Sequence, residues 1–137
     1  PGNCTIVEGI SPANHLKSIK NETEIKGFQN AVVKDGVALT KFYIWLEKQM
    51  AEGTQVTEIS AAEKLTALRA EQPQYIMDSF GTICGYAEHG AIVHYSATPE
   101  TDATLKPEGL LLIDSGAQYL DGRISPARSP LESRRSR

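Results

Sequence analysis

Apolar residues recur at helical spacing through much of the first half of the chain, from Asn21 to Ala51. They lie three, four or seven positions apart, which places them along one face of a helix. Glu22 and Glu24 fall in the first turn, where the helix dipole favours negative charge, and Gly53 follows the last turn. The pattern predicts one long helix over residues 21–51, with a buried face formed by Ile25, Phe28, Val32, Leu39, Phe42, Leu46 and Met50.

A shorter helical pattern follows over residues 57–70. Thr57 can cap this helix, and Ser60 with Glu63 offers an alternative capping box one turn later. Pro73 lies just beyond the end. We expect a second helix here, with buried positions at Ile59, Ala62, Leu65 and Leu68.

After Pro73 the pattern changes to short runs rich in β-branched and aromatic residues, which are typical of strands. We expect strands within residues 75–86, where Gly81 and Gly85 interrupt the run, and over residues 91–95 and 110–119. A turn at 88–90 and a polar loop over 99–109 connect them. Two helices followed by strands without intervening helices predict an α+β fold with a mostly antiparallel sheet.

Neither end of the chain shows such a pattern. Residues 1–18 have no period and are expected to form a linker or entry segment. Residues 123–137 carry five arginines and one glutamate, a charge of 5 − 1 = +4, whereas residues 1–122 carry 9 − 16 = −7. The tail has too few apolar residues to offset the entropy lost on ordering, so we predict a disordered basic tail.

Composition narrows the class of protein. The chain has 137 residues, 40% hydrophobic residues and a net charge of −3, which suits one globular domain. It has no apolar run of membrane-spanning length and no signal-peptide pattern, so we expect no membrane partner. Cys4 and Cys84 lie far apart and outside any C-x-x-C spacing, which indicates a reducing, cytoplasmic location. The body is acidic and the tail lacks interleaved aromatic residues, so no nucleic-acid partner is expected.

Asp114 is the most informative candidate for chemistry. It ends the apolar run 110–113, where an ionised carboxylate is costly unless it is paired or bound to a cation. Ser115 and Gly116 follow and leave room for an ion or ligand. Taken alone, these residues leave two interpretations open, a functional carboxylate and a structural aspartate that forms a cap or turn.

His94 is the second candidate, although a lone strand histidine is commonly a core or edge residue with satisfied hydrogen bonds. His89 is five positions away, so on an extended strand the two side chains face opposite sides and do not suit a shared metal. We expect three other acidic residues to be solvated: Glu100, Asp102 and Asp121.

Longer motifs carry a family resemblance. The run AIVHYSATPETDATLKPEGLLLIDSGAQYLDG at 91–122 closely resembles the aminopeptidase P (Xaa-Pro aminopeptidase) branch of the pita-bread metallopeptidases. The earlier runs KSIKNETEIKGFQNA and DGVALTKFYIWLE resemble the opening helix of that catalytic domain. The resemblance extends from about residue 10 to residue 122. It implies that residues 19–122 form the first, N-terminal half of a pita-bread catalytic domain.

The resemblance also implies roles for both candidates. Asp114 would be the first ligand of a centre with two divalent metal ions, typically manganese, which activates a water molecule for attack on the peptide bond. His94 would bind the substrate and the reaction intermediate. The substrate would be a peptide with proline in second position, a bond that ordinary aminopeptidases cleave poorly because proline lacks an amide N–H. Members of the family are often homodimeric.

The match to the family stops after Gly122. The family has a second aspartate eleven residues after the first, whereas Ser125 stands at that place, and the family's later histidine and two glutamates have no counterpart. Codons that encode residues 123–137 can be chosen so that the neighbouring frame reads T-D-I-T-R-T, which resembles the missing segment.

From this departure we expect a fragment with a frameshifted tail that is inactive alone. The alternative is a non-catalytic module of the same fold that binds a peptide or protein. A related hydrolase of small amidino compounds fits the HYSATPE run less well.

Overall fold

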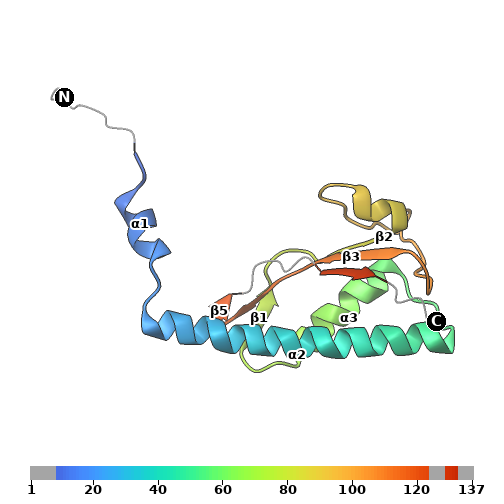
Figure 1. The fold of residues 1–137 in the computed structure, drawn as a ribbon, viewed down its shortest axis with the longest axis horizontal. Helices are drawn as coiled ribbons and strands as arrows, with labels where there is room; N and C mark the ends of the chain where they lie inside the picture. The colour runs from blue at the N-terminus through green and yellow to red at the C-terminus, as the bar shows by residue number, and fades with distance from the viewer. Residues whose placement is uncertain (1–8, 124–128, 133–137) are drawn as a thin grey trace.

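The longest element is helix α2, Glu22–Glu52, which runs beneath the rest of the fold in the computed structural model (Figure 1). The structure describes residues 9–123 and 129–132. Asn21 caps α2 because its side chain accepts from the backbone N–H of Glu24 while the Glu24 carboxylate accepts from that of Asn21. Gly53 ends the helix in the left-handed conformation, at φ 68°. The predicted helix is confirmed to within one residue at each end.

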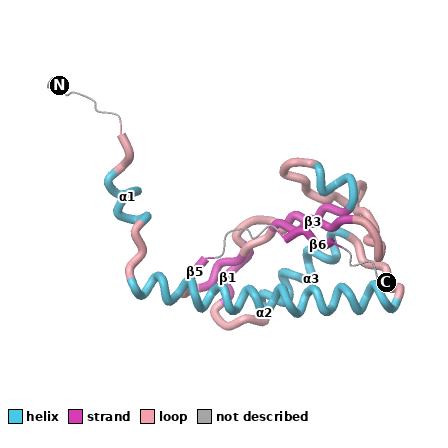
Figure 2. Tube along the Cα trace, viewed as in Figure 1, coloured by secondary structure: helices cyan, strands magenta, loops and turns pink. Residues whose placement is uncertain are grey.

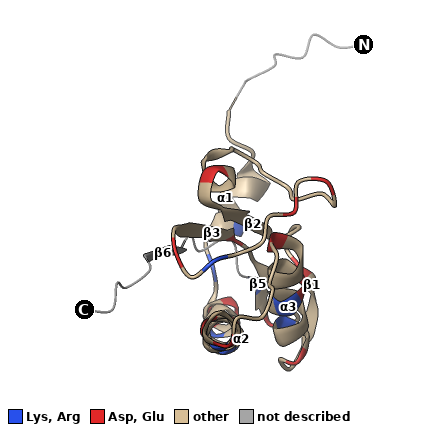
Figure 3. Cartoon of the chain, turned by 90° about the vertical axis from the view of Figure 1, so that its right-hand side faces the viewer, with Lys and Arg blue, Asp and Glu red and all other residues tan. Residues whose placement is uncertain are grey.

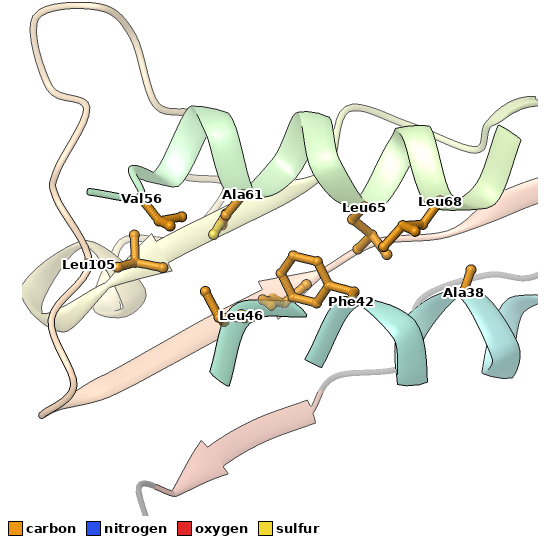
Figure 4. Packing of buried hydrophobic residues seen from close by; sticks show 10 residues of the cluster. Ala38, Phe42, Leu46, Val56, Ala61, Leu65, Leu68 and Leu105 are labelled. Atoms are coloured by element: carbon orange, nitrogen blue, oxygen red, sulfur yellow. The ribbon is translucent and has the colours of Figure 1, made fainter. Parts of the chain in front are cut away.

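Helix α3, Glu58–Ala70, packs against α2 and is capped by Thr57, as predicted. The capping box pairs Thr57 with Ser60, so the alternative box that begins at Ser60 is not used. Apolar side chains fill the space between the two helices, and Cys84 and Ile113 from the strands complete this core. Figure 4 shows its main members: Ala38, Phe42, Leu46, Val56, Ala61, Leu65, Leu68 and Leu105.

The buried face of α2 differs from the prediction in its first half. Ile25 and Val32 are exposed, and the buried positions there are instead Gly27, Ala31 and Asp35. The physical reason is a close approach, because the backbone around Gly122 lies against Gly27, where only small side chains fit. From Phe42 onward the predicted face is buried or half-buried.

The strands form two three-stranded antiparallel sheets on one side of the helices (Figures 2 and 3). In the first, β3 (Leu110–Asp114) lies between β2 (Ile83–Tyr86) and β6 (Ser129–Glu132). In the second, β4 (Ala117–Tyr119) lies between β1 (Tyr75–Asp78) and β5 (Gly122–Arg123). The α+β class with antiparallel strands is confirmed. The predicted strand 110–119 is broken at Ser115–Gly116, where the chain passes from one sheet to the other.

The predicted strand over residues 91–95 is wrong. The 3-10 helix η1, Ala87–Ala91, occupies the predicted turn, and a turn follows it. A Cβ on Gly85 would lie 3.0 Å from the backbone nitrogen of Gly90, so η1 folds back onto strand β2 at two glycines. This long-range contact overrides the local strand propensity of Ile92 and Val93, whose side chains are exposed.

Short elements occur within the two segments that were expected to form a linker and a disordered tail. Residues 12–18 form an exposed helix, α1 (Pro12–Ser18), because proline is well accommodated at a first helical position. In the tail, Arg123 belongs to β5, and β6 pairs with the edge of β3 through backbone groups, which any sequence carries. The remaining parts of both predictions, at 1–8, 124–128 and 133–137, lie outside the described residues.

Among the described residues, no helix combines the length and the apolar character needed to cross a membrane.

Replacing Gly27 by alanine should lower the free energy of unfolding by about 1–3 kcal/mol, because the new Cβ would collide with the backbone oxygen of Asp121. Gly36→Ala is the matched control on the same helix, since nothing lies within 4 Å of its Cβ position. That control should be neutral or more stable by up to about 1 kcal/mol through helix propensity. Urea unfolding of both variants measures the difference, and equal stability would contradict the close packing.

Candidate functional site

Asp114 ends strand β3 and lies on the face of its sheet that points away from the helices. Cys84 and Ile113 are paired across β2 and β3, and both are buried in the core against the helices. Ile83 and Asp114 form the next pair, so their side chains face the opposite side of the sheet. The fold therefore presents this carboxylate on the side that neither α2 nor α3 covers.

One oxygen of the Asp114 carboxylate is buried without a partner. Its Oδ1 atom has less than 1 Å² of accessible surface and no hydrogen bond within the described chain. Such an oxygen is costly unless a hydrogen-bond donor or a cation satisfies it. A carboxylate oxygen in this state fits one ligand position of a metal ion.

A complete metal site needs more ligands than the described residues supply. Within residues 9–123, no group of three or more histidine, cysteine, aspartate or glutamate side chains could hold an ion. Cys84 is not available as a ligand or nucleophile, because burial raises the pKa of its thiol to about 12. Asp114 therefore stands as a single candidate ligand.

His94 is not in a strand. It lies exposed in the turn after η1, in the left-handed conformation at φ 57°. In the described part of the chain its side chain forms no hydrogen bond or ion pair, and none joins it to Asp114. The interpretation of His94 as a satisfied core or edge residue is therefore wrong. A non-glycine residue in this conformation is uncommon, and such conformations cluster at functional sites.

A buried carboxylate that the sequence analysis missed anchors the segment around His94. Glu58, the first residue of α3, is fully buried. It accepts hydrogen bonds from the backbone N–H of Tyr86 at 2.7 Å and of Ala103 at 3.2 Å. The Tyr95 hydroxyl donates to it at 2.7 Å, and Nδ1 of His89 lies 3.0 Å away. Glu58 thus fastens the chain on both sides of His94 to the start of α3.

These hydrogen bonds also set the charge state of Glu58. Burial alone raises the pKa of this carboxyl, but the bonds from Tyr86, Tyr95, Ala103 and His89 outweigh that effect and leave the pKa below its ordinary value. Burial and the neighbouring Glu58 charge raise the pKa of the Tyr95 hydroxyl, although its hydrogen bond to Thr101 opposes this. Tyr95 therefore stays protonated, and its hydroxyl donates a hydrogen bond to an ionised Glu58.

A second buried network contacts the residues that directly follow Asp114. Arg69 is fully buried and donates to both carboxylate oxygens of Asp35, from Nε at 2.9 Å and from Nη2 at 3.2 Å. Arg69 also donates to the Ser115 hydroxyl at 3.1 Å. The Tyr119 hydroxyl donates to Asp35 at 3.3 Å, and burial together with the Asp35 charge raises the pKa of Tyr119 well above its ordinary value. No functional role was expected for Asp35 or Arg69 from the sequence.

Two of the three acidic residues expected to be solvated have structural roles instead. Asp102 accepts from the backbone N–H of Ile59 at 2.9 Å, in the first turn of α3. Asp121 pairs with Lys34 at 2.8 Å, and this hydrogen bond holds the pKa of Asp121 below its usual range. Glu100 is exposed, as expected.

Comparisons with known proteins agree with one another on the family. The sequence profile of metallopeptidase family M24 matches residues 26–128. The chain is 42% identical over 127 residues to a probable Xaa-Pro aminopeptidase P of Laccaria bicolor, covering 93% of this chain and 20% of that protein. It is 40% identical over 123 residues to the Xaa-Pro aminopeptidase ApepP of Drosophila melanogaster, covering 90% and 20%. The chain thus spans about a fifth of the length of these relatives.

Solved structures give the same result for the fold. An X-prolyl aminopeptidase of Caenorhabditis elegans, described as a cytosolic enzyme with a di-nuclear active site, matches with a TM-score of 0.85 and 32% identity, over 93% of this chain and 21% of that one. An X-Pro aminopeptidase of Thermotoga maritima matches with a TM-score of 0.65 and 21% identity, over 78% of this chain and 28% of that one. At that identity the second likeness supports the fold alone.

Glu58→Gln should destabilise the protein by about 1–3 kcal/mol at neutral pH, because the new amide N–H₂ faces groups that themselves donate. The pKa of Glu58 is lowered in the folded state, so its contribution is full above the ordinary glutamate pKa of about 4.3 and is lost as the pH falls through the lowered value. Thermal melts between about pH 7 and pH 3 should therefore show a shallower acid loss in the variant.

Glu71→Gln is the matched control for this experiment. Glu71 also has a lowered pKa, through its hydrogen bond with Lys41, but that pair is exposed to solvent. Solvent screening makes its effect small. If the Glu58 variant showed the same pH profile as the wild type, the buried hydrogen bonds would not govern the titration.

Proposed function

This chain belongs to metallopeptidase family M24, and from that membership we propose that it forms the first half of the catalytic domain of a metal-dependent Xaa-Pro aminopeptidase. The whole enzyme would remove the N-terminal residue of a peptide whose second residue is proline. Relatives that carry this activity in their names support the proposal, as does the structural likeness to an X-prolyl aminopeptidase.

One observation within this chain carries the proposal, namely the unpartnered Oδ1 atom of Asp114. Asp114 falls in the run LIDSGAQYLDG, on the face of the sheet that the helices leave open. We propose that this carboxylate binds one of two divalent ions, and manganese suits such a hard oxygen ligand. When bound, the ions would lower the pKa of a water molecule and polarise the peptide carbonyl.

The residues of this chain contribute position and hydrogen bonds to that reaction. His94 projects from an exposed turn, where a ring N–H could donate to an oxygen of the substrate or of the intermediate. Glu58 holds Tyr86 on one side of this turn and Tyr95 on the other, so the turn is fixed to α3. The backbone that carries His94 therefore needs little reorganisation when a substrate arrives.

The location and the alternative function follow from separate observations. We propose a cytoplasmic protein, since the Caenorhabditis elegans relative is described as a cytosolic enzyme. The alternative, a module that binds a peptide or protein without catalysis, rests on the fold alone. The full enzyme and the binding module differ in whether a complete ligand set joins Asp114.

The chain alone should not release the N-terminal residue from an Xaa-Pro-Pro peptide, even with added Mn²⁺, because Asp114 is a single candidate ligand. The activity should appear in a chimera in which residues 10–122 replace the matching segment of the Drosophila melanogaster enzyme. In that chimera Asp114→Ala should remove bound metal and activity together. His94→Ala should keep the metal and lower kcat by about 100-fold, as expected for the loss of one donor to the intermediate.

His15→Ala is the matched control, because His15 lies in the exposed helix α1 and the proposed reaction does not involve it. Metal content by mass spectrometry and peptide turnover measure both quantities. A chimera with Asp114→Ala that retained all its metal would contradict the ligand assignment. An inactive wild-type chimera with a full complement of metal would favour the binding module.

A further inference from the structure

The backbone directly after Asp114 is held from the helix side of the sheet. Side chains alternate along a strand, so Ser115 faces the helices when Asp114 faces away from them. Ser115 is 4% exposed and accepts from Arg69 Nη2 at 3.1 Å. The carbonyl oxygen of Gly116 accepts from Arg69 Nη1 at 3.5 Å and from the backbone N–H of Ser79 at 2.9 Å. The crossing, Ser115–Gly116, where the chain passes from one sheet to the other, is thus held at two successive residues.

Arg69 has no freedom to move away from this crossing. Its guanidinium is fully buried on α3, and the Asp35 carboxylate on α2 engages it with both oxygens. A planar guanidinium that is gripped in this way has a fixed direction, so its remaining N–H groups point at fixed places. Those places are the Ser115 hydroxyl and the Gly116 carbonyl.

Asp114 has no comparable restraint of its own on Oδ1, so the direction of its side chain depends on the backbone that carries it. We propose that Arg69, held by Asp35, is a positioning residue that fixes the direction of the Asp114 carboxylate toward a metal ion. This inference rests on the proposed function of Asp114 as a ligand. Groups that do not bind the metal but orient its ligands typically contribute about 10–100-fold to metal affinity.

Packing alone does not require this pair. A buried ion pair is often replaced by apolar residues of similar volume without loss of stability. Such a replacement would keep the helices together but would remove the hydrogen bonds that Arg69 donates to Ser115 and Gly116. Positioning and packing can therefore be separated in the double variant Asp35→Leu/Arg69→Met.

The test measures the direction of the Asp114 side chain in the 137-residue chain by NMR couplings that report its χ1 rotamer. The wild type should populate one rotamer, and both Asp35→Leu/Arg69→Met and Ser115→Ala should show averaging between rotamers. Lys41→Ala is the control, because it breaks an exposed ion pair with Glu71 at the end of α3 and leaves Arg69 intact. If the double variant fails to fold, Ser115→Ala alone decides, since it removes one hydrogen bond and keeps the ion pair.

Mn²⁺ binding separates the inference from the function on which it rests, and it is measured in the chimera with the Drosophila melanogaster enzyme, where further ligands can join Asp114. In that chimera Asp114→Asn should abolish Mn²⁺ binding, and the positioning variants should need about tenfold more Mn²⁺ for half-saturation. A single unchanged rotamer in Ser115→Ala would overturn the positioning role. Equal Mn²⁺ binding by the Asp114→Asn chimera and the unsubstituted chimera would instead overturn the ligand assignment, whatever the rotamers show.

Discussion

The ion pair between Asp35 and Arg69 fixes how the helices meet the strands. Both side chains are almost completely buried, and removing one partner of such a pair costs about 3–5 kcal/mol because a charge is left without compensation. The pair therefore demands that α2, α3 and the crossing at Ser115 and Gly116 keep one arrangement. Apolar packing holds the helices together, and the directional hydrogen bonds of the pair add a fixed orientation that apolar contacts do not supply.

A second buried carboxylate, Glu58, also holds strands and loops to the helices, but it does so without an arginine partner. Glu58 is surrounded by donors from β2, η1 and the loop before β3, and the hydrogen bonds keep it ionised in spite of its burial. Each of the two acids fastens one otherwise irregular segment to the helices. Asp35 acts through Arg69 on the crossing after Asp114, and Glu58 acts on the turn that carries His94.

The helices could be predicted from the sequence because their signals are local. Periodicity and capping residues lie within a few positions of each other, and both helices begin and end close to the predicted residues. The turn at residues 91–95 could not be predicted from local sequence, because it depends on the contact between Gly85 and Gly90. Asp35 and Arg69 depend on partners 34 to 84 positions away. The sequence does contain a signal that Asp35 is buried, since Asp35 lies between Ala31 and Ala38 on the buried face of the helix.

The two interpretations that the sequence leaves open for Asp114 differ in what its oxygens should contact. A structural aspartate in this fold resembles Asp102, whose carboxylate accepts from a backbone N–H in the first turn of α3. The Oδ1 atom of Asp114 is hidden from solvent but accepts from nothing in the described chain. Its neighbour Ser115 is satisfied by Arg69 on the other face of the sheet. The end of this strand is firmly held on one side and carries an unsatisfied carboxylate oxygen on the other. This arrangement suits a metal ligand, because a cation can then bind that oxygen at a fixed place without first reordering the chain.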